Sequence, residues 1–162
     1  MTFNPDKCEV MRITHHRDFS IPTYHFFGKP LKVANKFKDL GIIMSNNLKW
    51  SEQVNSTVNK ASRILGLIKR TVGYSNTVVF AKLYKALVQS ILEYASLVWS
   101  PYQVKEVKAL EGIQRRASRL ALKQKRGEML YEQRCKLLKW DTLEKRRAHL
   151  SLVECYINGV QS

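Results

Sequence analysis

The hydrophobic pattern of the chain changes its period close to Trp50, and this change divides the chain into two differently folded parts. Before it, apolar runs are short and end in turn-forming residues, as in "FKDLGIIMSNN" at residues 37–47. Such a run is typical of a strand followed by a turn. After it, apolar residues recur at steps of three and four, the period of an amphipathic helix. The sequence therefore predicts an α+β fold that is mostly α, with a boundary between residues 48 and 49.

The first part, residues 1–48, contains four candidate strands at residues 8–14, 23–27, 31–33 and 37–44. Pro22 and Pro30 lie at the ends of these runs, where the missing N–H removes no bond from the interior of a sheet. Short strands separated by turns favour an antiparallel arrangement. We expect a small antiparallel sheet of three or four strands.

The second part, residues 49–162, contains five candidate helices, near residues 51–72, 76–99, 104–123, 128–139 and 141–159. The first has Ser51 as a candidate N-cap, Gly73 as a stop signal, and an apolar stripe made of Trp50, Val54, Val58, Ala61, Leu65, Ile68 and Val72. In the last helix, Asp141 and Glu144 have the spacing of a capping box.

The helix predicted near residues 76–99 has apolar residues almost all round, which predicts that it forms the buried centre of the bundle. Glu93 lies within this apolar surface. Because a buried carboxylate needs a partner, we expect a Lys or Arg from a neighbouring helix beside it.

Charge is the strongest indication of a partner. Lys and Arg number 28 against 13 Asp and Glu, for a net charge of +15. Such a field favours a polyanion, with nucleic acid first and an anionic membrane surface second. The longest apolar segment, residues 77–99, is interrupted by Lys82, Lys85 and Glu93, so we expect no membrane span. The N-terminus has no apolar signal region, and three widely spaced cysteines favour free thiols, so we expect an intracellular protein, nuclear or cytoplasmic.

Basic residues gather on one side of the helix predicted at residues 104–123. Residues 114–126 hold six basic side chains and no acid. A solvated face normally mixes both signs, so this clustering predicts phosphate binding, with a merely solvated face as the alternative. The helix at residues 51–72 has a weaker basic face. The candidate nucleic-acid-binding residues are Lys60, Arg63, Arg70, Lys105, Lys108, Arg115, Arg116, Arg119 and Lys123. Arg146 and Arg147 could bind nucleic acid, but we interpret them as structural partners of glutamates.

Six segments occur in a distinctive order: "NPDKCEV", "KDLGIIMSNNLKW", "KASRILGLIKR", "LYKALVQSILEYASLVWSPY", "LEGIQRRASRLAL" and "TLEKRR". Together they resemble the C-terminal part of reverse transcriptases from non-LTR retrotransposons of the jockey-like group, over roughly residues 3–159. The resemblance implies that residues 1–48 are the end of a palm and that residues 49–162 are a thumb-like helical bundle. It places the primer grip at Lys38, Leu40 and Gly41, and it places Lys7 near the nucleotide site.

The resemblance implies a fragment of an RNA-directed DNA polymerase that grips the primer end and the RNA–DNA hybrid. The family's metal-binding carboxylates belong to earlier motifs, and no Asp-Asp, Asp-Glu or Glu-Glu dipeptide occurs here. Two-metal phosphoryl transfer needs clustered carboxylates. We therefore expect no catalytic residue, metal site or cofactor in this chain, no activity from it alone, and an upstream palm and fingers region as partner. Mg²⁺ is expected only for a full-length polymerase.

Two alternatives stay open. One is a non-enzymatic basic helical module that binds nucleic acid, derived from a decayed or co-opted element. The other is a helical protein that lies on a membrane surface, with basic residues at the headgroups and apolar faces toward lipid.

Overall fold

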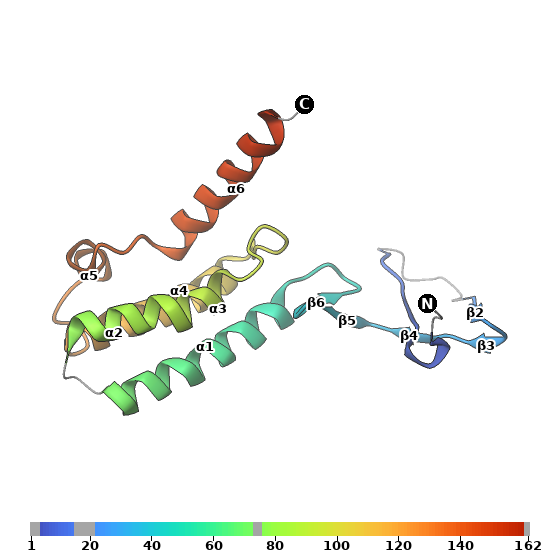
Figure 1. The fold of residues 1–162 in the computed structure, drawn as a ribbon, viewed down its shortest axis with the longest axis horizontal. Helices are drawn as coiled ribbons and strands as arrows, with labels where there is room; N and C mark the ends of the chain where they lie inside the picture. Colours follow the sequence, from blue (N-terminus) through green and yellow to red (C-terminus); the bar gives the residue numbers. More distant parts are fainter. Residues whose placement is uncertain (1–3, 15–21, 73–75, 161–162) are drawn as a thin grey trace. The chain divides into compact units, whose positions relative to one another are not determined.

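The computed structural model describes residues 4–14, 22–72 and 76–160. The fold is α+β and mostly α, as the sequence predicted (Figure 1). The chain divides into two compact units, one up to Gln53 and one from Val54 onward.

The first unit contains short strands that pair two by two. A 3₁₀ turn, η1 (Pro5–Lys7), precedes β1 (Glu9–Met11), β2 (His25–Phe26), β3 (Lys29–Pro30), β4 (Lys32–Ala34), β5 (Lys36–Asp39) and β6 (Ile42–Ser45). β2 pairs with β3 and β5 with β6 in antiparallel fashion, whereas β1 pairs with β4 in parallel. The prediction of one antiparallel sheet is therefore wrong in this detail. Strands of two to four residues form too few ladder bonds and bury too little surface to build a larger sheet.

Residues 37–44 form a hairpin and not the single strand that we predicted. β5 and β6 are joined at Leu40 and Gly41, whose φ angles are 45° and 86°. Two consecutive left-handed residues are the requirement of the type I′ turn, whose twist matches that of the strands it joins. The Ile43 N–H donates to Gln53 Oε1 at 2.9 Å, which ties β6 to the first turn of the following helix.

The first helix, α1 (Ser51–Val72), buries the predicted apolar stripe, above all Val54, Ala61, Leu65 and Ile68. It begins at Ser51 itself. The predicted stop at Gly73 lies outside the described residues.

The next helical stretch runs through α2 (Thr77–Leu83), a π-helical segment η2 (Tyr84–Gln89) and α3 (Ser90–Glu93). Asn76 is its N-cap, since Asn76 Oδ1 accepts hydrogen bonds from the N–H groups of Val78 and Val79 at 2.9 and 3.2 Å. The stretch ends at Glu93, not at Trp99 as predicted, because Tyr94 leaves the helical conformation with ψ 125°.

This stretch is buried on one side only, so the prediction of an all-round buried centre is wrong. Its buried residues recur every fourth position, at Phe80, Tyr84, Val88 and Leu92. Leu87 is 46% exposed. The reason is geometric: a helix needs neighbours on every side to bury its whole circumference, and this small bundle leaves one side to solvent.

The remaining helices are α4 (Val104–Ala121), α5 (Tyr131–Leu138) and α6 (Leu143–Val160). α4 lies against α2, α5 and α6, and it buries Leu110, Ile113, Ala117 and Ala121. Asp141 and Glu144 do not form the predicted capping box of α6. Thr142 precedes the helix instead, and its Oγ1 accepts a hydrogen bond from the Lys145 N–H at 3.3 Å. The outer half of α6 projects from the bundle, as Figure 1 shows, and its side chains from Ala148 to Ile157 are exposed.

Candidate nucleic-acid interface

A basic groove of about 360 Å³ lies between α1 and α4. Part of its lining follows from the helical period: because Ala61, Leu65 and Ala117 pack inward, the adjacent residues Ser62, Gly66 and Arg116 lie at the edge of the interface. None of the described residues that line the groove is acidic. They are Ser62, Leu65, Gly66 and Lys69 from α1, Arg116, Arg119 and Leu120 from α4, and Gln124 just beyond it.

The three cations of this groove are available to an anion. Arg116 Nη2 donates to Ser62 Oγ at 2.8 Å, which holds the guanidinium across the interface between the two helices. Lys69 is exposed and Arg119 is half-buried. Within the described part of the chain, no carboxylate forms an ion pair with any of the three. Planar guanidinium forks beside a point charge suit the oxygens of a phosphate group.

The basic residues predicted on α4 do not form a single face. Lys105 and Lys108 are exposed on the solvent side of α4, and Lys123, which follows the end of the helix, is exposed as well. Arg116 turns toward α1, whereas the neighbouring Arg115 turns toward α5, where its guanidinium carbon lies 5.0 Å from the centroid of the Tyr131 ring. Adjacent helical residues are separated by about 100°, which directs them to different neighbours.

On α1, the predicted residues Lys60, Arg63 and Arg70 are all exposed, but none of them lines the groove. The cation that does is Lys69, which our sequence analysis did not single out. Its signal was available, because Lys69 lies four residues after the buried Leu65 and therefore on the edge of the apolar stripe.

The residues that the resemblance assigns to the primer and nucleotide sites lie in the first unit. Lys38, Leu40 and Gly41 share the β5–β6 hairpin and are exposed, with Leu40 at 82%. Lys7 ends η1, where its N–H donates to Asn4 O at 3.1 Å, and its side chain is also exposed. The hairpin thus presents a backbone turn to its surroundings, and Lys7 belongs to a separate element.

Arg146 and Arg147 are both structural, but only Arg146 is the partner of a glutamate that we predicted. Arg146 forms an ion pair with Glu93, the basic partner that a half-buried carboxylate requires. Arg147 donates to the carbonyl oxygens of Trp99 and Leu92 at 3.2 and 2.6 Å, and its guanidinium carbon lies 4.5 Å from the centroid of the Trp99 ring. Burial lowers the pKa of Arg147. Both side chains are engaged in fixing α6 and are poor candidates for nucleic-acid binding.

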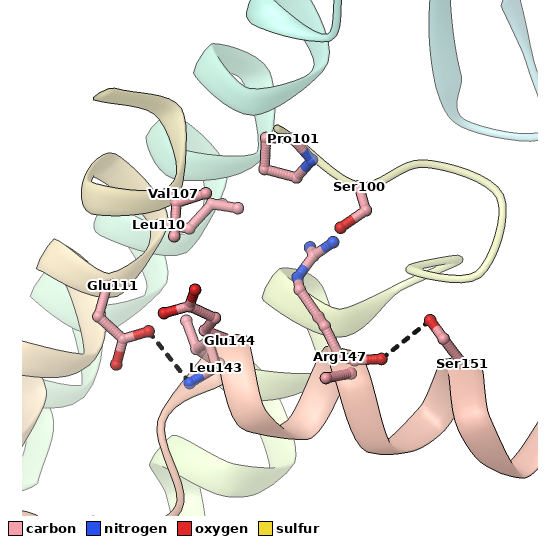
Figure 2. A pocket seen from close by; sticks show the side chains of 10 residues that line it. Ser100, Pro101, Val107, Leu110, Glu111, Leu143, Glu144, Arg147 and Ser151 are labelled. Atoms are coloured by element: carbon pink, nitrogen blue, oxygen red, sulfur yellow. Dashed lines mark hydrogen bonds between the residues drawn. The ribbon is translucent and has the colours of Figure 1, made fainter. Parts of the chain in front are cut away.

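A second cavity, of about 230 Å³, lies between the start of α6, α4 and the segment at Ser100 and Pro101 (Figure 2). Its charged lining has both signs, with Glu111 and Glu144 beside Arg147. Figure 2 shows the Glu111 carboxylate bonded to the Leu143 N–H, at 3.1 Å. Because Arg147 is already bonded and two carboxylates are near, this cavity suits a phosphate group less well than the α1–α4 groove does.

A buried polar network sets the orientation of α4. Tyr84 OH donates to Gln114 Oε1 at 2.8 Å, and Gln114 Nε2 donates to Tyr131 OH at 3.0 Å and to Asp141 O at 2.7 Å. Tyr131 OH in turn donates to Glu111 Oε1. Burial and the neighbouring Glu111 raise the pKa values of both tyrosines, so both hydroxyls keep their protons. The network connects α4 with η2 and α5, and it thereby fixes where Arg115 and Arg116 point.

Among the described residues, no group of three or more His, Cys, Asp or Glu side chains could hold a metal ion. None of the described helices combines the length and the apolarity that crossing a membrane requires. No family model, curated protein or solved structure matches the chain.

Proposed function

We propose that this chain is the nucleic-acid-gripping end of an RNA-directed DNA polymerase of a mobile element. The observation that carries the nucleic-acid part is the α1–α4 groove, which is lined by Lys69, Arg116 and Arg119 and by no acidic residue among those that the structure describes. In this proposal the helical unit acts as a thumb that holds the RNA–DNA hybrid through its phosphates. The β5–β6 hairpin acts as the primer grip.

Contacts to phosphate suit this role because they carry affinity without reading sequence. A polymerase must move along any template, so a surface of arginines and lysines is more useful to it than base-reading side chains. Other exposed cations extend the positive field around the groove: Lys60, Arg63 and Arg70 on α1, Lys105 and Lys108 on α4, and Lys123 just beyond α4.

The polymerase part of the proposal rests on the resemblance of the ordered sequence segments. The hairpin geometry supports it: Leu40 and Gly41 are exposed and left-handed, so their backbone can be approached closely. A glycine at such a turn leaves room for a ligand to reach the main chain. In the proposal, the primer terminus meets this turn.

The alternative is a non-enzymatic module that binds nucleic acid through the same groove. The two differ in what precedes the chain in the gene. A coding sequence upstream of Met1 that contains a polymerase palm, and primer extension by a protein that joins the two, would support the polymerase. An upstream region without a palm would support the module.

The nucleic-acid part is tested directly by binding. Fluorescence anisotropy with labelled RNA–DNA hybrids of two unrelated sequences should give nearly equal dissociation constants that rise with salt. Flotation with anionic vesicles at the same salt is the comparison, since a membrane-surface protein would bind vesicles instead. Vesicle binding without hybrid binding would contradict the proposal.

A further inference from the structure

Three arginines gather where α4 meets α5. The guanidinium carbons of Arg115 and Arg134 lie 5.0 and 5.8 Å from the centroid of the Tyr131 ring. Arg119 lies one helical turn after Arg115, on the same side of α4. The cluster therefore draws two residues from α4 and one from α5, and it includes an arginine and a tyrosine that our sequence analysis did not assign to any site.

Arg134 is fixed in place but is not neutralised. It is only 5% exposed; its Nε donates to Ser118 Oγ at 3.0 Å, and its Nη1 donates to Met129 O. Both acceptors are uncharged. Among the described residues, no carboxylate forms an ion pair with Arg115, Arg119 or Arg134.

The carboxylate beside Tyr131 is already in use. Glu111 accepts hydrogen bonds from Tyr131 OH and from the Leu143 N–H. Tyr131 offers its ring face to the two guanidinium groups, a favourable but modest compensation. Burial lowers the pKa of Arg134, and the charges of Arg119 and Arg115 lower it further. The cluster thus holds three positive charges that repel one another.

We propose that Arg115, Arg119 and Arg134 form a discrete phosphate-binding site at the α4–α5 junction. Arg115 is exposed and Arg119 is half-buried, so both can reach an anion, while Arg134 supplies a fixed charge beneath the surface. Arginine suits this site because its planar fork bonds two phosphate oxygens at once. The inference rests on the proposed function only where it names a nucleic-acid strand as the source of the phosphate. The chemistry of the site does not depend on that function.

The site differs from the α1–α4 groove in its residues. Lys69 and Arg116 belong to the groove alone, Arg115 and Arg134 belong to the phosphate site alone, and Arg119 contributes to both. This division makes the two separately testable. Substitutions at Arg115 and Arg134 address the phosphate site, and substitutions at Lys82 and Lys145, exposed lysines outside both the site and the groove, are the matched controls.

The experiment follows the binding of inorganic phosphate to the whole chain. The melting temperature is measured at increasing phosphate concentrations, and sodium chloride is adjusted so that the ionic strength stays constant. Phosphate should raise the melting temperature of the wild-type chain, because a ligand that binds only the folded state stabilises it. Arg115→Gln should lower the affinity for phosphate about tenfold, because the loss of one hydrogen bond to a charged group has an effect of this size. Lys82→Gln and Lys145→Gln should leave the phosphate affinity within about twofold of the wild type.

Arg134 is tested with two substitutions. Arg134→Lys keeps the charge and should retain most of the phosphate affinity, whereas Arg134→Met removes the charge and should lose it. If the methionine variant does not fold, Arg115→Gln decides by itself. If phosphate stabilises the wild-type chain no more than chloride does, the site is overturned. Equal losses of phosphate affinity in the Arg115→Gln and Lys82→Gln variants would overturn it as well.

The source of the phosphate is resolved by repeating the series with a labelled RNA–DNA hybrid. Weaker hybrid binding by Arg115→Gln would support a nucleic-acid strand as the ligand. If Arg115→Gln loses phosphate binding but binds the hybrid as the wild type does, a nucleic-acid strand is not the ligand of this site. A wild-type chain that binds phosphate but no hybrid would overturn the proposed function and leave the site standing.

Discussion

Arg146 of α6 holds Glu93 of α3 at two points: its Nη2 lies 2.9 Å from Glu93 Oε2, and its Nε bonds to Glu93 Oε1. Gln89 Nε2 donates to Oε1 as well, at 2.9 Å. The Glu93 side chain is 14% exposed, so water reaches it only in part and these partners supply its hydrogen bonds within the fold. The pair fixes the start of α6 against α3, and the hydrogen bond to Glu93 raises the pKa of Arg146.

Removal of this pair should destabilise the fold. Arg146→Gln should lower the free energy of unfolding by about 1–2 kcal/mol, because Glu93 then keeps only uncharged donors. The lower part of the usual range is expected because the Arg146 side chain is 40% exposed and solvent screens the pair. Urea unfolding measures the change, and Lys145→Gln at an exposed neighbouring position is the control. Equal midpoints for the two variants would show that the pair is dispensable.

The one-sided burial of the α2–α3 stretch gives a matched pair of substitutions. Leu92 is fully buried, and Leu92→Ala should cost about 2–5 kcal/mol through the cavity it leaves. Leu87 is 46% exposed, so Leu87→Ala should cost well under half of that. Chemical denaturation of both variants checks this. A larger loss at Leu87 would mean that the apolar residues of this stretch are buried on the other side.

Gly66 lies in the middle of α1 on the edge of the groove. A methyl group added there would meet only Arg70 Nη1, at 3.9 Å, so the chain itself does not require a glycine. Gly66→Ala should therefore stabilise the fold by about 0.5–1 kcal/mol through helix propensity, and so should Gly112→Ala, whose added methyl group meets nothing within 4 Å. Thermal unfolding measures both.

The same glycine gives a binding prediction. If a phosphate strand enters the groove, the Gly66→Ala methyl group should weaken hybrid binding although the protein is more stable. Gly112 does not line the groove and serves as the comparison. Unchanged hybrid affinity in the Gly66 variant would place the strand elsewhere.

The buried tyrosines predict how stability falls at alkaline pH. Burial, with Glu111 as the next cause, raises the pKa of Tyr131 above its ordinary value. A raised pKa in the folded state contributes stability that is fully present below the unfolded value of about 10 and is lost as the pH rises above it.

Tyr131→Phe removes this contribution, so its free energy of unfolding should fall less steeply above about pH 10, by up to about 1.4 kcal/mol per pH unit. Denaturant unfolding across that pH range measures the slope. Tyr156→Phe is the control, since Tyr156 is 74% exposed. Parallel curves for the wild type and Tyr131→Phe would contradict the buried network.

The helices could be predicted from the sequence because their signals are local. The apolar stripe of α1 and the start of the next helix near residue 76 depend on residues a few positions apart. The strand pairs were harder. The Leu40–Gly41 turn requires a bulky residue with positive φ, and the parallel pairing of β1 with β4 joins residues more than twenty positions apart, such as Glu9 and Lys32.

The sequence predicted that basic residues of α4 would form the candidate site, but it did not predict which helices these residues contact. Clustered arginines on α4 indicated phosphate binding, yet the helical period alone could not show that Arg115 and Arg116 contact different helices. Arg134 acquires its role from packing against α4, which its own sequence neighbourhood does not show. Arg134 bonds to Ser118, sixteen residues before it. Such contacts follow from packing, which no local pattern specifies.

If the α1–α4 groove holds nucleic acid by its phosphates, the salt dependence of hybrid binding must depend on the cations that line the groove. The groove variant carries Lys69→Gln, Arg116→Gln and Arg119→Gln. The control variant carries Lys82→Gln, Lys136→Gln and Lys145→Gln, at exposed positions outside the groove, and it also loses three charges.

The logarithm of the hybrid binding constant is measured against the logarithm of the salt concentration. We predict that the slope becomes shallower by roughly two to three units in the groove variant and much less in the control, because each neutralised phosphate of B-form DNA contributes about 0.9 to the slope. Equal slopes for two folded variants would contradict the groove as the phosphate-binding surface.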